Sequence, residues 1–172
     1  MMLEIALDTD EEWDSSSGGK IAWDELVRKA AEAAIAESAF PQLMKSERTV
    51  ELSVRLTGDE EVRSLNAQWR GKDKATNVLS FPMLEPHDLE RTNVAGPELL
   101  LGDIILARSV CEAEAADKGI SFEQHATHLL VHGTLHLLGY DHHDEDQATD
   151  MEGREVRALK RLGIANPYEG SA

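Results

Sequence analysis

The chain has 172 residues, a length that fits one domain with a substantial buried core. Hydrophobic residues make up 41% and charged residues 29%, which excludes a disordered chain and predicts a soluble globular protein. The net charge of −16 excludes binding of nucleic acid through a basic surface that covers the whole molecule.

Two further features of the composition concern the cellular compartment. No window approaches the roughly 18 apolar residues of a membrane span, and the first residues, MMLEIALDTDEEWD, do not have the pattern of a signal peptide. The single cysteine, Cys111, cannot form an internal disulfide, which fits a reducing environment. We therefore expect a cytoplasmic protein that does not bind membranes.

The N-terminal part of the chain predicts strand, connector, helix and strand in that order. Leu3–Leu7 alternates with period two and predicts a strand, and Asp14–Gly19 is a flexible connector. Trp23–Ala39 has apolar residues at helical spacing, and Pro41 ends this predicted helix. Thr49–Leu56 alternates strictly and predicts a half-buried strand.

The middle of the chain predicts a helix, a strand and a loop. Asp59 is expected to cap a helix that extends to about Trp69. Thr76–Phe81 predicts a strand that Pro82 stops. Leu84–Pro97 holds prolines, a glycine and several charges, and predicts a surface loop.

The next segments predict a central strand and two helices. Leu99–Leu106 is apolar enough for a strand buried on both faces. A helix is expected over about Ala107–Ala116, before an exit at Asp117-Lys118-Gly119. Ser121 and Gln124 form a capping box for a helix that continues to Leu138.

A left-handed stop at Gly139 and a last helix complete the predicted elements. Asp144 is expected to cap that helix, which reaches about Leu162 before Gly163. Strands interleaved with helices, followed by helices alone, predict an α/β (α+β) fold. We expect one domain over residues 1–172, with a mixed, mostly four-stranded sheet packed against helices.

The segment HGTLHLLGYDH contains three histidines in the pattern of a metal site. His132 and His136 are four residues apart in a predicted helix, so their side chains point in directions that differ by only about 40°. Gly139 allows a sharp turn that brings His142 back toward them. Three imidazoles suit zinc and leave one coordination position open, which is typical of a catalytic site. The sequence therefore predicts a zinc site on a helix and on the turn that follows it.

Other histidines and two aspartates offer alternatives around this site. His128 lies four residues before His132 and can hydrogen-bond to a ligand, serve as a spare ligand or be an ordinary helix residue. His143 competes with His142 as the third ligand. Asp141 and Asp144 can orient a ligating imidazole, although Asp144 serves equally as a helix cap.

The residue after the first histidine separates this motif from that of a metalloprotease. The HExxH motif supplies two ligands and a glutamate base, and its xxGxxH extension gives the metzincin pattern. This chain keeps the ligand spacing but has Gly133 in place of the glutamate, which disfavours proteolysis. A metal can still lower the pKa of bound water to about 7. We also expect Gly133 to leave open space beside the metal for a phosphate backbone.

A locally basic stretch precedes the third predicted strand. Four basic residues and one acidic residue occupy positions 63–74 of this acidic chain. Arg70 can bind a phosphate in bidentate geometry, and Lys72 and Lys74 add positive charge, with solvated loop residues as the alternative for the lysines. We expect Trp69 to fill the core, with base stacking as the alternative.

Two segments resemble the signatures of the YbeY family of bacterial endoribonucleases. HGTLHLLGYDH resembles the family pattern HGxLHLxGYDH at every specified position, and the segment LNAQWRGKDKATNVLSFP resembles LNxxYRxxxxxTDVLSFP. LLGDIIL and LGIANPY are also similar to their family counterparts, so the resemblance extends from about Val50 onward. Trp69 replaces a tyrosine of the pattern. Asn77 replaces an aspartate, so we assign no acid/base role to it.

The resemblance implies a metal-dependent endonuclease that is specific for single-stranded RNA. It implies action in ribosomal RNA processing, including maturation of the 16S rRNA 3′ end, and in ribosome quality control, with the small ribosomal subunit and its proteins as partners and no DNA substrate. His132, His136 and His142 would bind one zinc ion, with another divalent transition metal such as nickel as the alternative. Arg70 would be the arginine of the active-site cleft.

The residues leave three questions open. The nucleophile is either water at the metal or the 2′-OH of the RNA. The substrate of a metal-dependent hydrolase with these ligands is RNA or, as the rival, another molecule such as a peptide. A second rival is a ribosome-assembly factor with structural zinc, which requires a fourth ligand such as His128 or His143.

Overall fold

The computed structural model describes residues 3–10, 13, 21–45, 48–85, 88–89 and 98–168. The helices and strands of these residues are, in chain order, β1 (Leu3–Thr9), α2 (Trp23–Ala36), the 3-10 helix η1 (Pro41–Lys45), β2 (Val50–Thr57), α3 (Asp59–Arg70), β3 (Val78–Pro82), β4 (Leu99–Ala107), α5 (Arg108–Lys118), α6 (Phe122–Leu137) and α7 (Glu145–Arg161). The expected connector at Asp14–Gly19 and most of the expected loop at Leu84–Pro97 lie outside the described residues.

The four strands form one mixed sheet, as the sequence predicts. Their order is β1-β2-β4-β3. β2 pairs in parallel with both β1 and β4, whereas β3 pairs antiparallel to β4 at the edge. Pro82 is the last residue of β3, and this position is compatible with proline because an edge strand has one side without strand partners.

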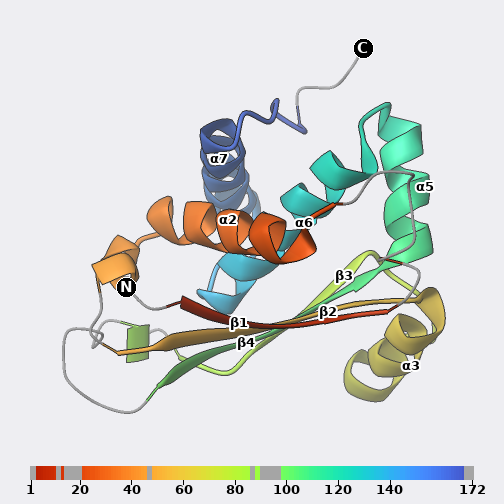
Figure 1. Cartoon of the computed structure of the whole chain (residues 1–172), viewed down its shortest axis with the longest axis horizontal. Helices are drawn as coiled ribbons and strands as arrows, with labels where there is room; N and C mark the ends of the chain where they lie inside the picture. Colours follow the sequence, from red (N-terminus) through yellow and green to blue (C-terminus); the bar gives the residue numbers. More distant parts are fainter. Residues whose placement is uncertain are drawn as a thin grey trace.

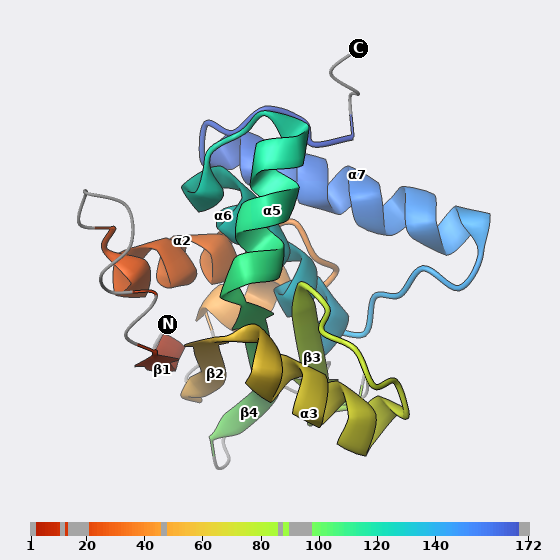
Figure 2. The ribbon, with the colours of Figure 1, turned by 90° about the vertical axis from the view of Figure 1, so that its right-hand side faces the viewer.

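The helices cover the two faces of the sheet unequally. Figures 1 and 2 show α2, α5, α6 and α7 on one side and α3 on the other. Both faces of the sheet need cover because consecutive residues of β4 point to opposite faces of the sheet. Ile104 lies in the main core and packs under Gly133 of α6, whereas Ile105 clusters with Val62 of α3.

Helix α6 is the central helix of the domain. It contacts β3 and β4 on one side and α2, α5 and α7 on its other sides. Most of its residues are therefore buried, including His125, His128 and Thr134. A helix packed against the sheet and three other helices provides a rigid support for the side chains that it directs into a site.

The sequence predicts N-terminal caps for three helices, and the structure confirms two of them. Ser121 and Gln124 form the expected capping box of α6, and Asp144 caps α7 by accepting a hydrogen bond from the backbone N–H of Gln147 at 2.8 Å. The predicted cap at Asp59 is wrong, because Gly58 is the N-cap of α3 and Asp59 is its first helical residue. In that position the Asp59 carboxylate still benefits from the helix dipole.

No helix in the described ranges has the length and apolar character needed to cross a lipid bilayer.

Candidate metal centre

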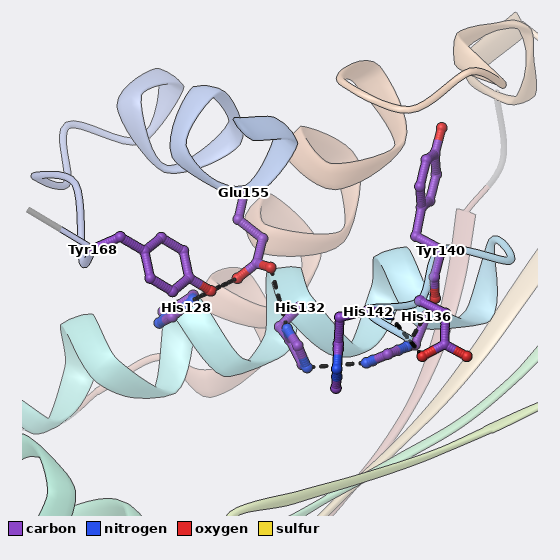
Figure 3. A network of polar contacts seen from close by, with 8 residues as sticks. His128, His132, His136, Tyr140, His142, Glu155 and Tyr168 are labelled. Atoms are coloured by element: carbon purple, nitrogen blue, oxygen red, sulfur yellow. Dashed lines mark hydrogen bonds and ion pairs between the residues drawn. The ribbon is translucent and has the colours of Figure 1, made fainter. Parts of the chain in front are cut away.

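The three histidines of the HGTLHLLGYDH segment come together in the structure. His132 and His136 lie one turn apart on α6, and their Nε2 atoms are 3.0 Å from each other. Gly139 has a φ of +99°, which a residue with a side chain rarely adopts, and it turns the chain so that His142 returns to the pair. One nitrogen from each of the three rings lies within 4.8 Å of the others, and Figure 3 shows the rings pointing toward one another.

The partners of the outer ring nitrogens determine where the protons lie. The Nδ1 of His136 donates to the carbonyl oxygen of Tyr140 at 2.8 Å, and the Nδ1 of His132 donates to the Glu155 carboxylate at 3.2 Å. Both partners can only accept, so each Nδ1 carries the proton and each Nε2 presents a lone pair. Burial and the neighbouring His132 lower the pKa of His136 to about 4, so this ring is neutral at pH 7.

Two converging lone pairs form a donor set for a cation. Tetrahedral zinc with Zn–N bonds of about 2.0–2.1 Å separates two nitrogen ligands by roughly 3.3 Å, close to the distance between the two Nε2 atoms. Neutral imidazoles are suitable ligands for zinc and for other borderline divalent ions. The three histidines therefore fit the metal that the sequence predicts.

These histidines line a cleft of about 520 Å³ between α6 and the edge strand β3. Arg70, at the end of α3, lines the same cleft. The remaining lining residues come from β3, from the residue before it, and from the segment after α6: Asn77, Val78, Ser80, Pro82, Gly139, Tyr140, Asp141 and His143. The cleft thus combines a candidate metal site with a guanidinium group, which is the combination needed to hold a phosphate.

The other residues of the basic stretch lie outside this cleft. Lys72 and Lys74 are exposed in the loop between α3 and β3, and neither lines the cleft. The side chain of Trp69 is 65% exposed, so the expectation that it fills the core is wrong. It lies on the last turn of α3, beyond the reach of the main core, and leaves an aromatic surface next to Arg70 in the chain.

The alternative ligands have other partners. His128 is buried, and its Nε2 donates to Glu155 at 2.6 Å. The exposed ring of His143 pairs with the Asp141 carboxylate at 2.7 Å. Asp141 also accepts a hydrogen bond from the backbone N–H of His142, and within the described residues no hydrogen bond joins its carboxylate to the rings of His132, His136 or His142. Among the described residues, the group that can share one ion contains three histidines and no fourth ligand.

Asn77 has a structural role that explains the departure from the family pattern. Its Nδ2 donates to the Glu114 carboxylate at 3.0 Å, and its Oδ1 accepts from the backbone N–H of Val78 at 2.7 Å. His125 also contacts Glu114, at 2.8 Å. An aspartate at position 77 would place a second carboxylate against Glu114, whereas the amide of asparagine supplies a donor.

Gly133 does not open space beside the metal, so that expectation is wrong. A Cβ atom at this position would lie 3.1–3.3 Å from side-chain atoms of Ile104, which is fully buried in β4. Gly133 therefore lies where α6 packs closely on the sheet. A glutamate at this position would begin with a Cβ atom crowded against Ile104, so glycine suits this close packing better than the glutamate of the protease motif does.

Glu155 is the site residue that the motif analysis missed. Burial raises the pKa of its carboxyl, but hydrogen bonds from His128, His132 and Tyr168 outweigh this effect and lower the pKa to about 2. The signal for it was present in the helical pattern of α7. Glu155 occupies the same stripe as Met151, Ala158 and Leu159, and a carboxylate on an otherwise buried stripe indicates a buried partner.

Comparison with known proteins identifies the family. The family model described as "Endoribonuclease YbeY" matches residues 11–163. Two relatives carry the same name. The relative from Rhizorhabdus wittichii is 48% identical over 97% of each chain. The relative from Sphingopyxis alaskensis is 52% identical over 85% of this chain and 88% of the relative. The solution structure of TM1509 from Thermotoga maritima shares the fold, with a TM-score of 0.52 and 23% identity over 94% of this chain and 92% of that one. The histidine cleft, the block that precedes and forms β3, and these matches place the chain in the YbeY endoribonuclease family.

Proposed function

We propose that this chain is a zinc-dependent endoribonuclease that cleaves single-stranded RNA. The observation that carries the proposal is the convergence of His132, His136 and His142 in a cleft that Arg70 also lines. The names of the relatives support RNA as the substrate class. A zinc ion held by the three imidazoles would supply Lewis-acid chemistry at an open coordination position.

The residues of the chain itself bind and orient the substrate. Arg70 binds a phosphate group of the RNA through two parallel N–H donors and stabilises the negative charge that grows during cleavage. Lys72 and Lys74 attract the RNA backbone to this side of an otherwise acidic molecule. Their exposure makes this attraction sensitive to salt. The metal ligands on α6 keep their positions because the helix packs against the sheet and three other helices.

The geometry around Gly133 supports RNA over a peptide substrate. The glutamate base of the HExxH proteases would have to occupy the position of Gly133, where even a Cβ atom lies in tight contact with Ile104. A structural zinc site would require a fourth ligand, and among the described residues the group that can share one ion contains His132, His136 and His142 alone. We therefore favour catalysis by a three-histidine site over both alternatives.

We further propose the cellular role that the family resemblance implies. The chain would act in the cytoplasm on ribosomal RNA, including the 3′ end of 16S rRNA, and in ribosome quality control. The small ribosomal subunit and its proteins would be its partners. The net charge of −16 supports docking against basic ribosomal proteins, while the basic stretch at Arg70 contacts the RNA.

The direct test uses purified, zinc-loaded protein with end-labelled single-stranded RNA, duplex RNA, DNA of the same sequence and a peptide library. We expect cleavage of single-stranded RNA alone. Arg70→Ala should reduce kcat about 100- to 1,000-fold with unchanged zinc content. Arg70→Lys should fall between wild type and Arg70→Ala, because lysine keeps the charge but not the bidentate geometry.

A matched control is Lys118→Ala, which removes a positive charge from the end of α5, outside the cleft. It should leave cleavage unchanged. Zinc-dependent cleavage of peptides without cleavage of RNA would overturn the proposal, as would full RNA cleavage by Arg70→Ala. A 2′-deoxy nucleotide at the cleavage position separates the two nucleophiles, because it blocks attack by the 2′-OH and permits attack by water.

A further inference from the structure

Glu155 of α7 is a buried carboxylate that joins the metal site to two residues outside it (Figure 3). Its side chain is 1% exposed. Oε1 lies 2.6 Å from His128 Nε2 and 2.6 Å from the Tyr168 hydroxyl, and Oε2 lies 3.2 Å from His132 Nδ1. Burying a charge costs free energy unless the charge is fully paired. A buried carboxylate at this position therefore indicates that the contacts it makes have a function.

The contact with His132 controls which ring nitrogen faces the metal site. An ionised carboxylate only accepts hydrogen bonds, so the His132 proton lies on Nδ1. The Nε2 of the same ring is then free of a proton and directed at His136. If the proton moved to Nε2, His132 would present an N–H group to the metal and would no longer be a ligand.

The other oxygen of Glu155 is fixed by two donors from different parts of the chain. The Nδ1 of His128 is buried and has no hydrogen-bond partner among the described residues, so a proton there would be an unsatisfied donor. The proton therefore belongs on Nε2, which donates to Glu155. Tyr168 follows α7 and donates its hydroxyl to the same oxygen. Glu155 is thus held from α6 and from the segment beyond α7.

We propose that Glu155 is a positioning residue that fixes the tautomer and orientation of His132 for metal binding, and that Tyr168 and His128 hold Glu155 in place for this task. This inference rests on the proposed metal site. It assigns to the segment after α7 an influence on metal affinity, although Tyr168 makes no contact with the three ligands in the described residues.

The substitution Glu155→Gln tests the proposal because it keeps the shape and replaces one acceptor with a donor. With its carbonyl oxygen on His128 and Tyr168, the glutamine directs its NH₂ group at His132 Nδ1 and favours the tautomer with the proton on Nε2. We expect the dissociation constant for zinc, measured by competition with a chelator, to rise about 10- to 100-fold. Tyr168→Phe removes one of the two donors on Oε1 and should raise this dissociation constant measurably, by up to about 10-fold.

The decisive readout is the tautomer itself. Nitrogen chemical shifts of the His132 ring in the metal-free protein at alkaline pH report which nitrogen carries the proton. Wild type should have the proton on Nδ1, and Glu155→Gln should move it to Nε2. Asp117→Asn removes the same charge at an exposed residue of α5 that does not line the cleft, and it should match wild type in both measurements.

The outcomes separate this inference from the proposed function. Unchanged zinc affinity and an unchanged His132 tautomer in Glu155→Gln would overturn the positioning role while leaving the metal site intact. Failure of wild type to bind zinc would overturn the metal site, and the tautomer would still test the positioning role. If Glu155→Gln does not fold, the Tyr168→Phe variant serves as the test, because it keeps the aromatic ring and loses only the hydroxyl. A zinc affinity of Tyr168→Phe equal to that of wild type would then contradict the inference.

Discussion

The packing of Gly133 against β4 gives a prediction whose magnitude follows from the structure. Gly133→Ala adds a Cβ atom 3.1–3.3 Å from the side chain of Ile104. The Ile104 side chain is fully buried, so it cannot move aside into solvent. Alanine also improves helix propensity by about 1 kcal/mol over glycine. Overpacking of a core costs about 1–3 kcal/mol. The free energy of unfolding should therefore fall by about 0–2 kcal/mol.

Gly153 of α7 provides a matched control. An added Cβ there meets only the far end of the flexible Arg157 side chain, at 3.3 Å. Gly153→Ala should therefore show the propensity gain alone and raise the free energy of unfolding by about 1 kcal/mol. Denaturant unfolding of the metal-free proteins measures both values, and the two variants should differ by about 1–3 kcal/mol.

A double-mutant cycle with Ile104→Ala tests the cause. Ile104→Ala alone should cost about 2–5 kcal/mol, because it leaves a cavity under α6. In that background, Gly133→Ala should no longer destabilise, and the coupling between the two sites should be about 0.5–3 kcal/mol. Equal stabilisation by Gly133→Ala and Gly153→Ala would refute the packing argument and would restore the view that Gly133 provides free space.

Three further predictions concern charges and metal binding. The lowered pKa of Glu155, about 2 against an ordinary value of 4.5, contributes stability that is present above about pH 4.5 and is lost as the pH falls toward 2. Unfolding of the metal-free protein between pH 6 and 2 should therefore show a steeper loss in wild type than in Glu155→Gln, and parallel curves would contradict the assignment. Asn77→Asp should lower the free energy of unfolding by about 1–2 kcal/mol at pH 7, because its carboxylate would face Glu114. Acidification should remove this deficit, which urea unfolding at pH 7 and pH 4 can measure. Zinc at 100 times its dissociation constant should raise the free energy of unfolding by about 2.7 kcal/mol. Calorimetry should find a much smaller rise in His142→Ala, and an equal rise would place the ion elsewhere.

The features that the sequence predicted correctly depend on residues close together in the chain. The period-two alternation of Leu3–Leu7 and Thr49–Leu56 predicted two of the four strands within one or two residues. The cap at Ser121 involves side chains three residues apart and was also predicted correctly. The histidine spacing, with its turn at Gly139, predicted the cluster for the same reason.

The features that the sequence missed depend on contacts between distant segments. Glu155 lies 23 residues from His132, and only the packing of α7 on α6 brings the two together. Gly133 meets Ile104 across the interface between a helix and a strand. Trp69 was assigned to the core by its residue type, although the last turn of α3 extends beyond the core. Side-chain type and spacing do not contain this information.

The most direct test of the central claim is the metal dependence of RNA cleavage. Wild type and His136→Ala would be purified in parallel, stripped of metal, and assayed on single-stranded RNA before and after addition of one equivalent of zinc. We expect cleavage only by wild type with zinc, with bound metal measured in the same samples. Cleavage by metal-free wild type at the full rate, or by His136→Ala at the wild-type rate, would contradict the claim that the three-histidine cleft is the active site.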